Sequence, residues 1–215
     1  MSLRPPASIA ELPERVRLFP LGGAILLPRS VMPLNIFEPR YLAMVRDAMM
    51  DDHMIAMIQP RDDTAQPELY AIGTLGRIIQ YSETGDGRFL ISLSGLARFR
   101  LREELSVTTP YRQAAVDYAP FEADWSPADP LAPAARAHLE STLKAYLEAQ
   151  GLSADWDAVK SADDESLVNT LSTVCPFTEA ERQALLESAT IPARAETLST
   201  LMQFASGGAG DRTLQ

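Results

Sequence analysis

The chain has 215 residues, of which 46% are hydrophobic and 22% are charged, a composition typical of soluble globular proteins. No run approaches the roughly 20 continuous apolar residues of a membrane helix, and the N-terminus lacks the apolar core of a signal peptide. The only cysteine is Cys175, which excludes an internal disulfide and an all-cysteine zinc site. We expect a cytoplasmic, bacterial-type protein with no cofactor, no bound metal and no membrane partner.

The net charge of −10 is concentrated in the second half, because residues 1–120 sum to about −1 and residues 121–215 to −9. Such an acidic field repels phosphate backbones, so nucleic acid is disfavoured as a partner. The hydrophobic periodicity also changes near residue 120. We therefore predict four segments: an N-terminal extension over 1–14, a β-domain over 15–122, a helical bundle over 123–206 and a tail over 207–215.

The first half has the pattern of short strands broken by turn residues. Strands are expected at 15–19, 24–27, 31–37 and 54–58, with one helix from Pro39 to Met50. Proline has no backbone N–H, so strands that contain or adjoin it are expected to be edge-like or kinked. Three prolines have this effect here: Pro20, Pro28 and Pro33.

The clearest strand signal is a hairpin in which 70–81 and 88–101 flank the turn residues 84–87, which contain Asp-Gly. Glycines inside strands favour bulges that bend a sheet, and here they are Gly73, Gly76 and Gly95. A further strand is expected at 111–118. Together these elements predict a small, mostly antiparallel β-barrel with one inserted helix.

The second half changes to helical periodicity. Ser126 and Pro127 have the pattern of an N-cap and first helical residue, and Gly151 that of a C-terminal stop. Further helices are expected over 163–174, after a capping box at Thr178 to Glu181, and from Pro192 onward. The overall prediction is an α+β chain in which a β-barrel precedes an α-helical bundle.

Several segments of the β-domain resemble the N-terminal domain family of Lon proteases: Leu18–Leu21, Leu27–Pro28, Met32–Leu42, Leu69–Ile78 and Gly95–Arg100. The resemblance implies a PUA-like barrel, a following helical bundle and the binding of polypeptide substrates. The positions that carry the motif are expected to be structural; they are Pro20, Pro28, Phe37, Glu38, Pro39, Arg40, Gly73, Gly95 and Arg98.

The catalytic motifs of a full Lon enzyme are absent from this sequence. No glycine precedes a lysine, so the Gly-x-x-x-x-Gly-Lys loop that cradles ATP phosphates does not occur. The only lysines are Lys144 and Lys160, and no Gly-Pro-Ser-Ala segment supplies a peptidase serine. We expect a stand-alone, non-catalytic relative.

Six of the eight methionines fall within residues 32–57. Thioether side chains adapt to varied apolar partners, so we hypothesise a polypeptide-binding surface formed by Met32, Tyr41, Met44 and Met50. The alternative is that the methionines fill an irregular gap between the helix and the barrel. The expected partner is an unfolded or partly unfolded polypeptide, or a protease or chaperone.

Two other functions stay open at this stage. PUA-like modules also bind RNA, but the arginines of residues 1–120 are almost cancelled by carboxylates. A small-ligand pocket in the barrel is the third candidate. His53, His138 and Cys175 are interpreted as structural or surface residues, and the acidic pairs near Asp62 and Asp163 lack the spacing of a calcium loop.

Overall fold

The computed structural model describes residues 6–207, in which the chain forms two compact units that divide after Pro127. The expected tail beyond residue 207 lies outside the described residues, as do the first five residues of the expected extension. The rest of that extension contains a short 3-10 helix, η1 (Ile9–Glu11). No helix within residues 6–207 has the length and apolar character needed to cross a membrane.

The first unit is built on a six-stranded sheet with the order β2-β5-β4-β3-β1-β6, in which β6 also pairs with β5. Pairing thus runs from β5 through β4, β3, β1 and β6 back to β5 as a closed ring, and β2 lies outside the ring as an edge strand. Among the strands within residues 6–207, only β1 and β3 pair in parallel. The strands are β1 (Arg15–Pro20), β2 (Val31–Ile36), β3 (Met54–Ile58), β4 (Ile72–Glu83), β5 (Phe89–Glu104) and β6 (Gln113–Asp117).

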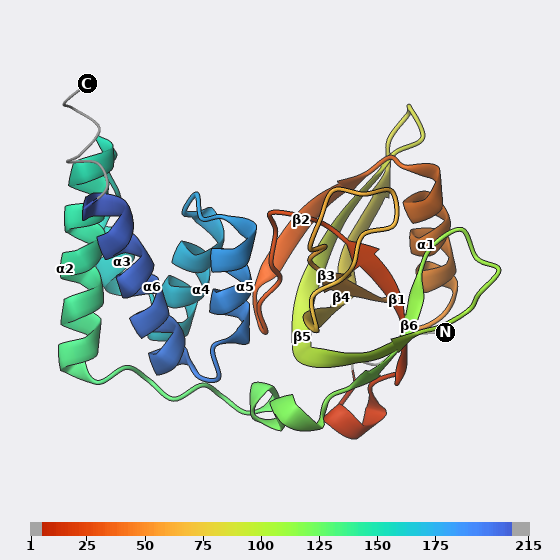
Figure 1. The fold of residues 1–215 in the computed structure, drawn as a ribbon, viewed down its shortest axis with the longest axis horizontal. Helices are drawn as coiled ribbons and strands as arrows, with labels where there is room; N and C mark the ends of the chain where they lie inside the picture. The colour runs from red at the N-terminus through yellow and green to blue at the C-terminus, as the bar shows by residue number, and fades with distance from the viewer. Residues whose placement is uncertain (1–5, 208–215) are drawn as a thin grey trace. The chain divides into compact units, whose positions relative to one another are not determined.

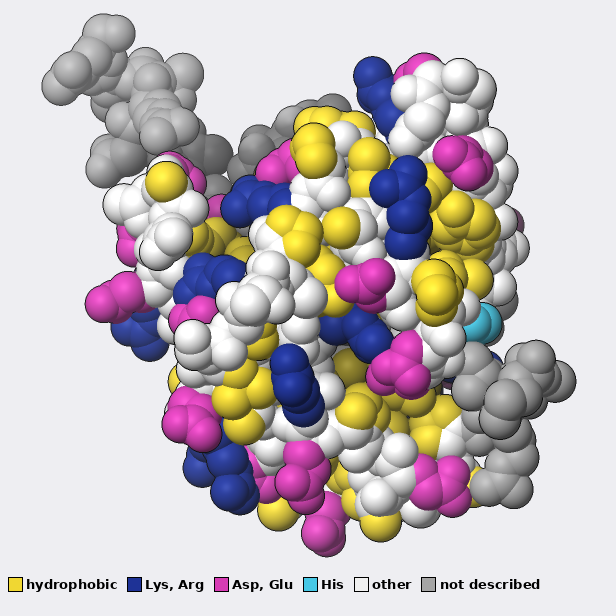
Figure 2. Space-filling model, turned by 90° about the vertical axis from the view of Figure 1, so that its right-hand side faces the viewer, with side chains coloured by type: hydrophobic (Ala, Val, Ile, Leu, Met, Phe, Trp, Pro, Cys, Tyr) yellow, Lys and Arg dark blue, Asp and Glu magenta, His cyan; other side chains and the backbone are white. Residues whose placement is uncertain are grey.

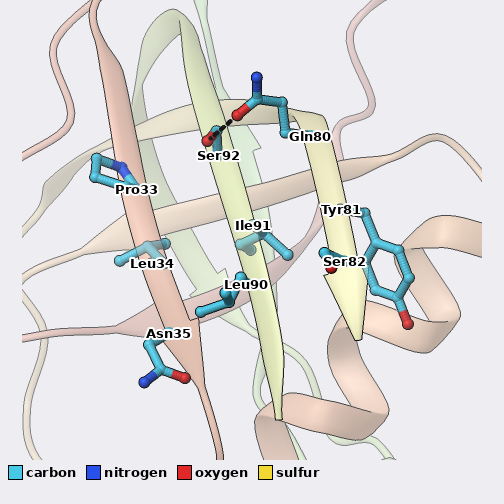
Figure 3. Close-up of a pocket in the computed structure, with 9 residues that line it drawn as sticks. All are labelled: Pro33, Leu34, Asn35, Gln80, Tyr81, Ser82, Leu90, Ile91 and Ser92. Carbon is cyan, nitrogen blue, oxygen red and sulfur yellow. Dashed lines mark hydrogen bonds between the residues drawn. The ribbon is translucent and has the colours of Figure 1, made fainter. Parts of the chain in front are cut away.

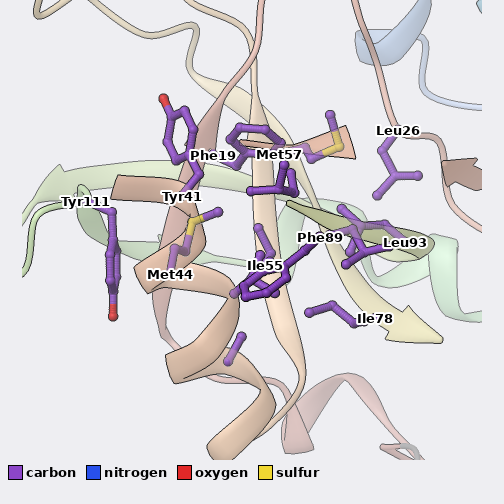
Figure 4. Close-up of a cluster of buried hydrophobic side chains, with 14 residues drawn as sticks. Phe19, Leu26, Tyr41, Met44, Ile55, Met57, Ile78, Phe89, Leu93 and Tyr111 are labelled. Carbon is purple, nitrogen blue, oxygen red and sulfur yellow. The ribbon is translucent and has the colours of Figure 1, made fainter. Parts of the chain in front are cut away.

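Alternation along the strands supplies two hydrophobic clusters, one on each face of the sheet. The first draws buried residues from every strand of the ring, including Leu18, Ala56, Leu75, Phe99 and Val116. The second holds helix α1 (Pro39–Met50) against the other face of the sheet (Figures 1 and 4). The mixed α+β class and the helix inserted between β2 and β3 are therefore as predicted.

The strand expected at 24–27 is wrong. This segment has no strand pairing, although Ile25, Leu26 and Leu27 are buried. Arg29 has a left-handed φ of 61°, and the backbone N–H of Ser30 donates to the Leu27 carbonyl, so the chain turns here instead of extending. The apolar run is explained by burial against the sheet, not by membership of it.

The predicted bends occur where the glycines allow close packing. The β4–β5 register shifts between Leu75 and Gly76, and again between Ile78 and Gln80. An added Cβ at Gly73 would lie 2.4 Å from the Met57 carbonyl oxygen, which explains why a side chain is absent. Pro33 lies on β2, the edge strand, as expected for a residue without a backbone donor.

Arg98 joins the sheet to η2 (Ala119–Trp125), a 3-10 segment that follows β6. Its buried guanidinium donates to Asp124 Oδ1 at 2.7 Å and lies 4.8 Å from the centre of the Phe121 ring. The backbone N–H of Arg98 also donates to Asp124 Oδ2 at 2.9 Å. Residues 119–125 therefore pack with the first unit, and the division lies five residues beyond the expected position at 122.

Within residues 128–207, all the regular secondary structure of the second unit is helical. The helices are α2 (Pro133–Gln150), α3 (Trp156–Ser161), α4 (Asp164–Val174), α5 (Glu179–Glu187) and α6 (Ile191–Gly207). The predicted start of its first helix at Ser126 is wrong, because Ser126 is the C-cap of η2 and α2 begins at Pro133. A helix from 127 would contain Pro133, which has no N–H to donate and disfavours helical geometry in the residue before it.

The other predicted helix ends are confirmed. Gly151 is the C-cap of α2 with a left-handed φ of 66°. Thr178 and Glu181 form the capping box of α5, in which the Thr178 backbone N–H donates to Glu181 Oε2 at 2.7 Å. Helix α3 was not expected, although its N-cap Asp155 accepts from two backbone N–H groups in the usual way.

Candidate functional site

Helix α1 begins at Pro39 beside an ion pair. Arg40 NH2 lies 2.8 Å from Glu38 Oε2, and the same guanidinium lies over the Tyr41 ring at 4.5 Å. This pair and ring contact fix the entry to the helix and keep the Arg40 charge at the surface. The motif residues Glu38, Pro39 and Arg40 thus have a structural arrangement, with Phe37 exposed just before them.

The four residues of the hypothesised methionine surface do not lie on one surface. Met44 is 0% exposed and Tyr41 is 6% exposed, and both belong to the cluster beneath α1 (Figure 4). Met32 is partly buried against the same cluster, whereas Met50 is 87% exposed. A binding role remains a prediction only for Met50 and the accessible part of Met32, and Met44 fills the gap between helix and sheet.

Exposed apolar side chains gather instead around β2, β4 and β5. Phe37 is 60% exposed and Leu90 is 46% exposed, and Val31, Ile79 and Tyr81 are exposed as well. The alternation of residues along β5 could have predicted that Leu90 is exposed, because burial of Phe89, Ile91 and Leu93 directs Leu90 to the other face.

These strands form a shallow hollow of about 560 Å³, here termed the strand groove (Figure 3). It is lined by three residues from each strand: Pro33, Leu34 and Asn35; Gln80, Tyr81 and Ser82; and Leu90, Ile91 and Ser92. No charged side chain is among them. Ser92 Oγ donates to Gln80 Oε1 at 2.9 Å across the groove, so its polar groups are amides and hydroxyls.

A second hollow, here termed the polar bowl, lies between the loops at 60–68 and 104–112 and has a volume of about 990 Å³. Arg112 joins the loops, since NH1 donates to the Pro67 carbonyl at 2.8 Å and Nε donates to Glu104 Oε2 at 2.6 Å. Tyr111 also lines the bowl, and its hydroxyl donates to Asp47 Oδ2 at 2.5 Å. Burial, followed by the Asp47 contact, raises the pKa of Tyr111 to about 12.

The groups that could support nucleophilic or metal chemistry are not arranged for it. Burial raises the pKa of the Cys175 thiol to about 11, which opposes formation of the reactive thiolate. The His53 ring is engaged through Nε2, 3.1 Å from the Met49 carbonyl oxygen. Over the part of the chain that the structure describes, no group of three or more His, Cys, Asp or Glu residues could hold a metal ion.

A family model described as the substrate-binding domain of ATP-dependent protease La (LON) matches residues 15–203, across both units. The chain belongs to this family. Among curated proteins, this Lon substrate-binding-domain protein is 31% identical to Lon protease 2 of Myxococcus xanthus over 122 residues, and 31% identical to Lon protease 2 of Sorangium cellulosum over 112 residues. These alignments cover 54% and 50% of the chain but only 15% and 14% of the relatives.

Two solved structures share the fold. The crystal structure of a Lon N-terminal domain protein from Xanthomonas campestris has a TM-score of 0.63 at 23% identity, and the match covers 86% of this chain and 97% of that one. The N-terminal domain of the Mycobacterium avium complex Lon protease has a TM-score of 0.62 at 17% identity, with coverage of 88% and 98%. The architecture of strands followed by helices is therefore that of Lon N-terminal domains.

Proposed function

We propose that this Lon substrate-binding-domain protein binds unfolded or partly unfolded polypeptide and performs no hydrolysis with its 215 residues. The family match over residues 15–203 is the observation that carries the proposal. The sequence contributes neither a phosphate-binding loop nor a Lon-type serine context, and Cys175 is buried. The closed ring of strand pairings also supports a PUA-like barrel as the scaffold of the first unit.

The strand groove is the surface that best suits such a ligand. An unfolded polypeptide offers apolar side chains and unpaired peptide groups. Exposed Leu90 and Tyr81 can contact the former, while Asn35, Gln80 and Ser82 can hydrogen-bond to the latter. A groove without charges avoids the cost of desolvating ionised groups when an apolar segment covers it.

Recognition by addition of a strand to β2 is less suitable. β2 pairs only with β5 among the described strands, so one side is an edge, but Pro33 lies in its middle and has no N–H to donate. We therefore expect the ligand to lie across the face of the groove, where side chains carry recognition.

An RNA ligand is supported less well than polypeptide. On the face shown in Figure 2, arginines are interspersed with carboxylates and apolar side chains instead of forming a continuous basic surface. Several arginines of the first unit are ion-paired, including Arg17 with Asp51 and Asp52, and Arg98 with Asp124. Phosphate recognition needs cations that are not already neutralised in this way.

The test replaces two exposed apolar residues by a β-branched polar residue, giving what is here termed the groove variant. Leu90→Thr changes the groove itself, and Val31→Thr changes the same face of β2 two residues before the lining residue Pro33. Binding of a reduced, carboxymethylated model protein is measured. Loss of two partial apolar contacts is expected to weaken binding roughly tenfold. The melting temperature should stay nearly constant because both side chains are exposed. A matched control is Leu152→Ser, an exposed apolar residue of the second unit.

A separate variant, Met50→Gln, tests the more exposed of the two residues for which the methionine hypothesis remains a prediction. If the groove variant binds the denatured protein as tightly as the unaltered chain, the groove is not the binding surface. If the unaltered chain does not distinguish the denatured protein from its native form, the proposed function itself is wrong.

A further inference from the structure

The polar bowl is acidic once its internal ion pairs are taken into account. The charged side chains that line it are Arg40, Arg112, Asp62, Asp63, Glu68 and Glu104. Arg40 pairs with Glu38, outside the bowl, and Arg112 pairs with Glu104. The charges left over are the carboxylates of residues 62, 63 and 68. Arg61, next to them in sequence, lies over the Tyr70 ring at 5.0 Å and does not line the bowl.

These carboxylates differ in how they are held. Asp62 accepts from the Thr64 hydroxyl and from the Thr64 backbone N–H, the latter at 2.9 Å, and these contacts keep its pKa below the ordinary value, so the group is ionised at neutral pH. Asp63 and Glu68 are exposed, and neither carboxylate forms an ion pair with any residue in 6–207. They are therefore available to an external cation.

An independent feature points to a ligand in the same place. Tyr41 lines the bowl, is only 6% exposed, and has no hydrogen bond to its hydroxyl from any described residue. Figure 4 shows this hydroxyl at the end of the ring directed away from the buried cluster. This hydroxyl is not among the fully buried polar atoms that lack a partner, so it reaches the space of the bowl and can accept a hydrogen bond from a ligand there.

The remaining walls suit an aliphatic stem. Proline and aliphatic side chains line the bowl between its polar groups: Pro20, Pro60, Leu105, Val107 and Pro110. Lysine and arginine bury their methylene groups against such surfaces while the charged end contacts polar groups. The face of the Tyr41 ring is already in contact with the Arg40 guanidinium, so a second cation would meet the hydroxyl end.

We propose that the polar bowl binds a lysine or arginine side chain of the polypeptide held by this protein, with Asp63 and Glu68 opposing its charge and the Tyr41 hydroxyl accepting a hydrogen bond. This inference rests on the proposed function and adds a preference to it: polypeptides that carry a lysine or arginine are bound best. The bowl and the strand groove have no lining residue in common.

The test uses the full chain and two fluorescein-labelled peptides that are identical except for a central Lys or Gln in an apolar, unstructured sequence. The Lys peptide should bind about fivefold more tightly at low salt, since one or two partly exposed ion pairs are worth that much. Salt should reduce the preference. The double variant Asp63→Asn with Glu68→Gln should remove it without changing affinity for the Gln peptide.

Matched controls separate this effect from the general acidity of the protein. Glu14→Gln with Glu122→Gln removes the same amount of charge from exposed positions that do not line the bowl, and should keep the preference. Tyr41→Phe should weaken the Lys peptide about threefold and leave the Gln peptide unchanged.

An absent Lys preference, or one that survives the bowl variant, overturns the inference. If the denatured model protein is still captured in that case, the proposed function stands and only the cationic preference fails. If neither peptide nor the denatured protein is bound, both proposals fail.

Discussion

Gly95 lies where β5 passes the turn that precedes β2. Its backbone N–H donates to the Ser30 carbonyl and its carbonyl accepts from Arg29, both at 2.9 Å. An added Cβ would lie 2.1 Å from the Leu27 carbonyl oxygen, far inside van der Waals contact. Glycine is therefore required at position 95 because any side chain would collide with the backbone of the preceding turn.

Gly95→Ala is expected to destabilise the protein by about 1–3 kcal/mol, because the turn must shift away from β5 and lose hydrogen bonds. Urea denaturation monitored by circular dichroism measures this. Gly85→Ala is the matched control, since an added Cβ there has no heavy atom within 4 Å. Equal stabilities of the two variants would show that the turn moves without cost.

For individual residues, the sequence predicted the chemical role of a side chain better than it predicted how far that side chain is exposed to solvent. Met44 and Met50 are on the same helix and have the same side chain, yet one is fully buried and the other is 87% exposed. Their difference depends on which face of α1 meets the sheet. The turn of about 100° per residue from Met44 places Met50 far around the helix, but only the tertiary contacts fix where the buried stripe ends.

At the scale of elements, α4 depends on its N-cap. Asp163 accepts from the Ser166 backbone N–H at 2.9 Å, and this contact lowers the pKa of its carboxyl below the reference value of 3.8. A carboxyl whose pKa is lowered by folding stabilises the native state above its unfolded pKa, and the contribution disappears as pH falls through the folded pKa.

Asp163→Asn should therefore lower the free energy of unfolding near neutral pH and have progressively less effect below about pH 4. Asparagine can still cap the helix, so the change isolates the charge. Thermal unfolding at a series of pH values tests the effect. Asp129→Asn, at an exposed carboxylate before α2, is the control. The same pH dependence in both variants would assign the effect to net charge.

Local rules predicted elements whose determinants are adjacent in sequence. The capping box at Thr178 and the stop at Gly151 each involve residues within one turn of each other. The start at Ser126 failed because a favourable local pair was outweighed by Pro133 further along. Helix α3 could have been found from Asp155, whose side chain caps it, but six residues carry little periodicity.

At the scale of the whole molecule, the division after Pro127 has a consequence for fragments. A fragment of residues 1–127 retains Asp124, whereas a fragment of residues 1–122 leaves Arg98 buried without its carboxylate. Breaking a buried ion pair costs roughly 3–5 kcal/mol. We expect the longer fragment to unfold cooperatively and the shorter one to be much less stable or unfolded, as measured by denaturant titration.

Asp124→Ala in the full chain provides the corresponding point change, in which chain length is constant. If this substitution leaves the stability of the first unit unaltered, loss of Asp124 does not explain a difference in stability between the two fragments.

The sites were less accessible to prediction than the fold. The strand groove combines residues near positions 34, 81 and 91, and the polar bowl combines loops about 40 residues apart. Only the pairing of β5 with both β2 and β4 brings the first set together. For the bowl, the link is a side-chain contact, Arg112 with the Pro67 carbonyl, which no local pattern specifies.

The closed ring of strand pairing also determines how long β1 lacks one of its partners while the chain is being synthesised. β1 (Arg15–Pro20) is made first, but its antiparallel partner β6 (Gln113–Asp117) follows almost a hundred residues later. At roughly 5–20 residues per second, a nascent chain holds that strand edge unpaired for about 5–20 seconds. During this interval the free edge of β1 is open to pairing with other chains, and that risk ends only when β6 closes the ring.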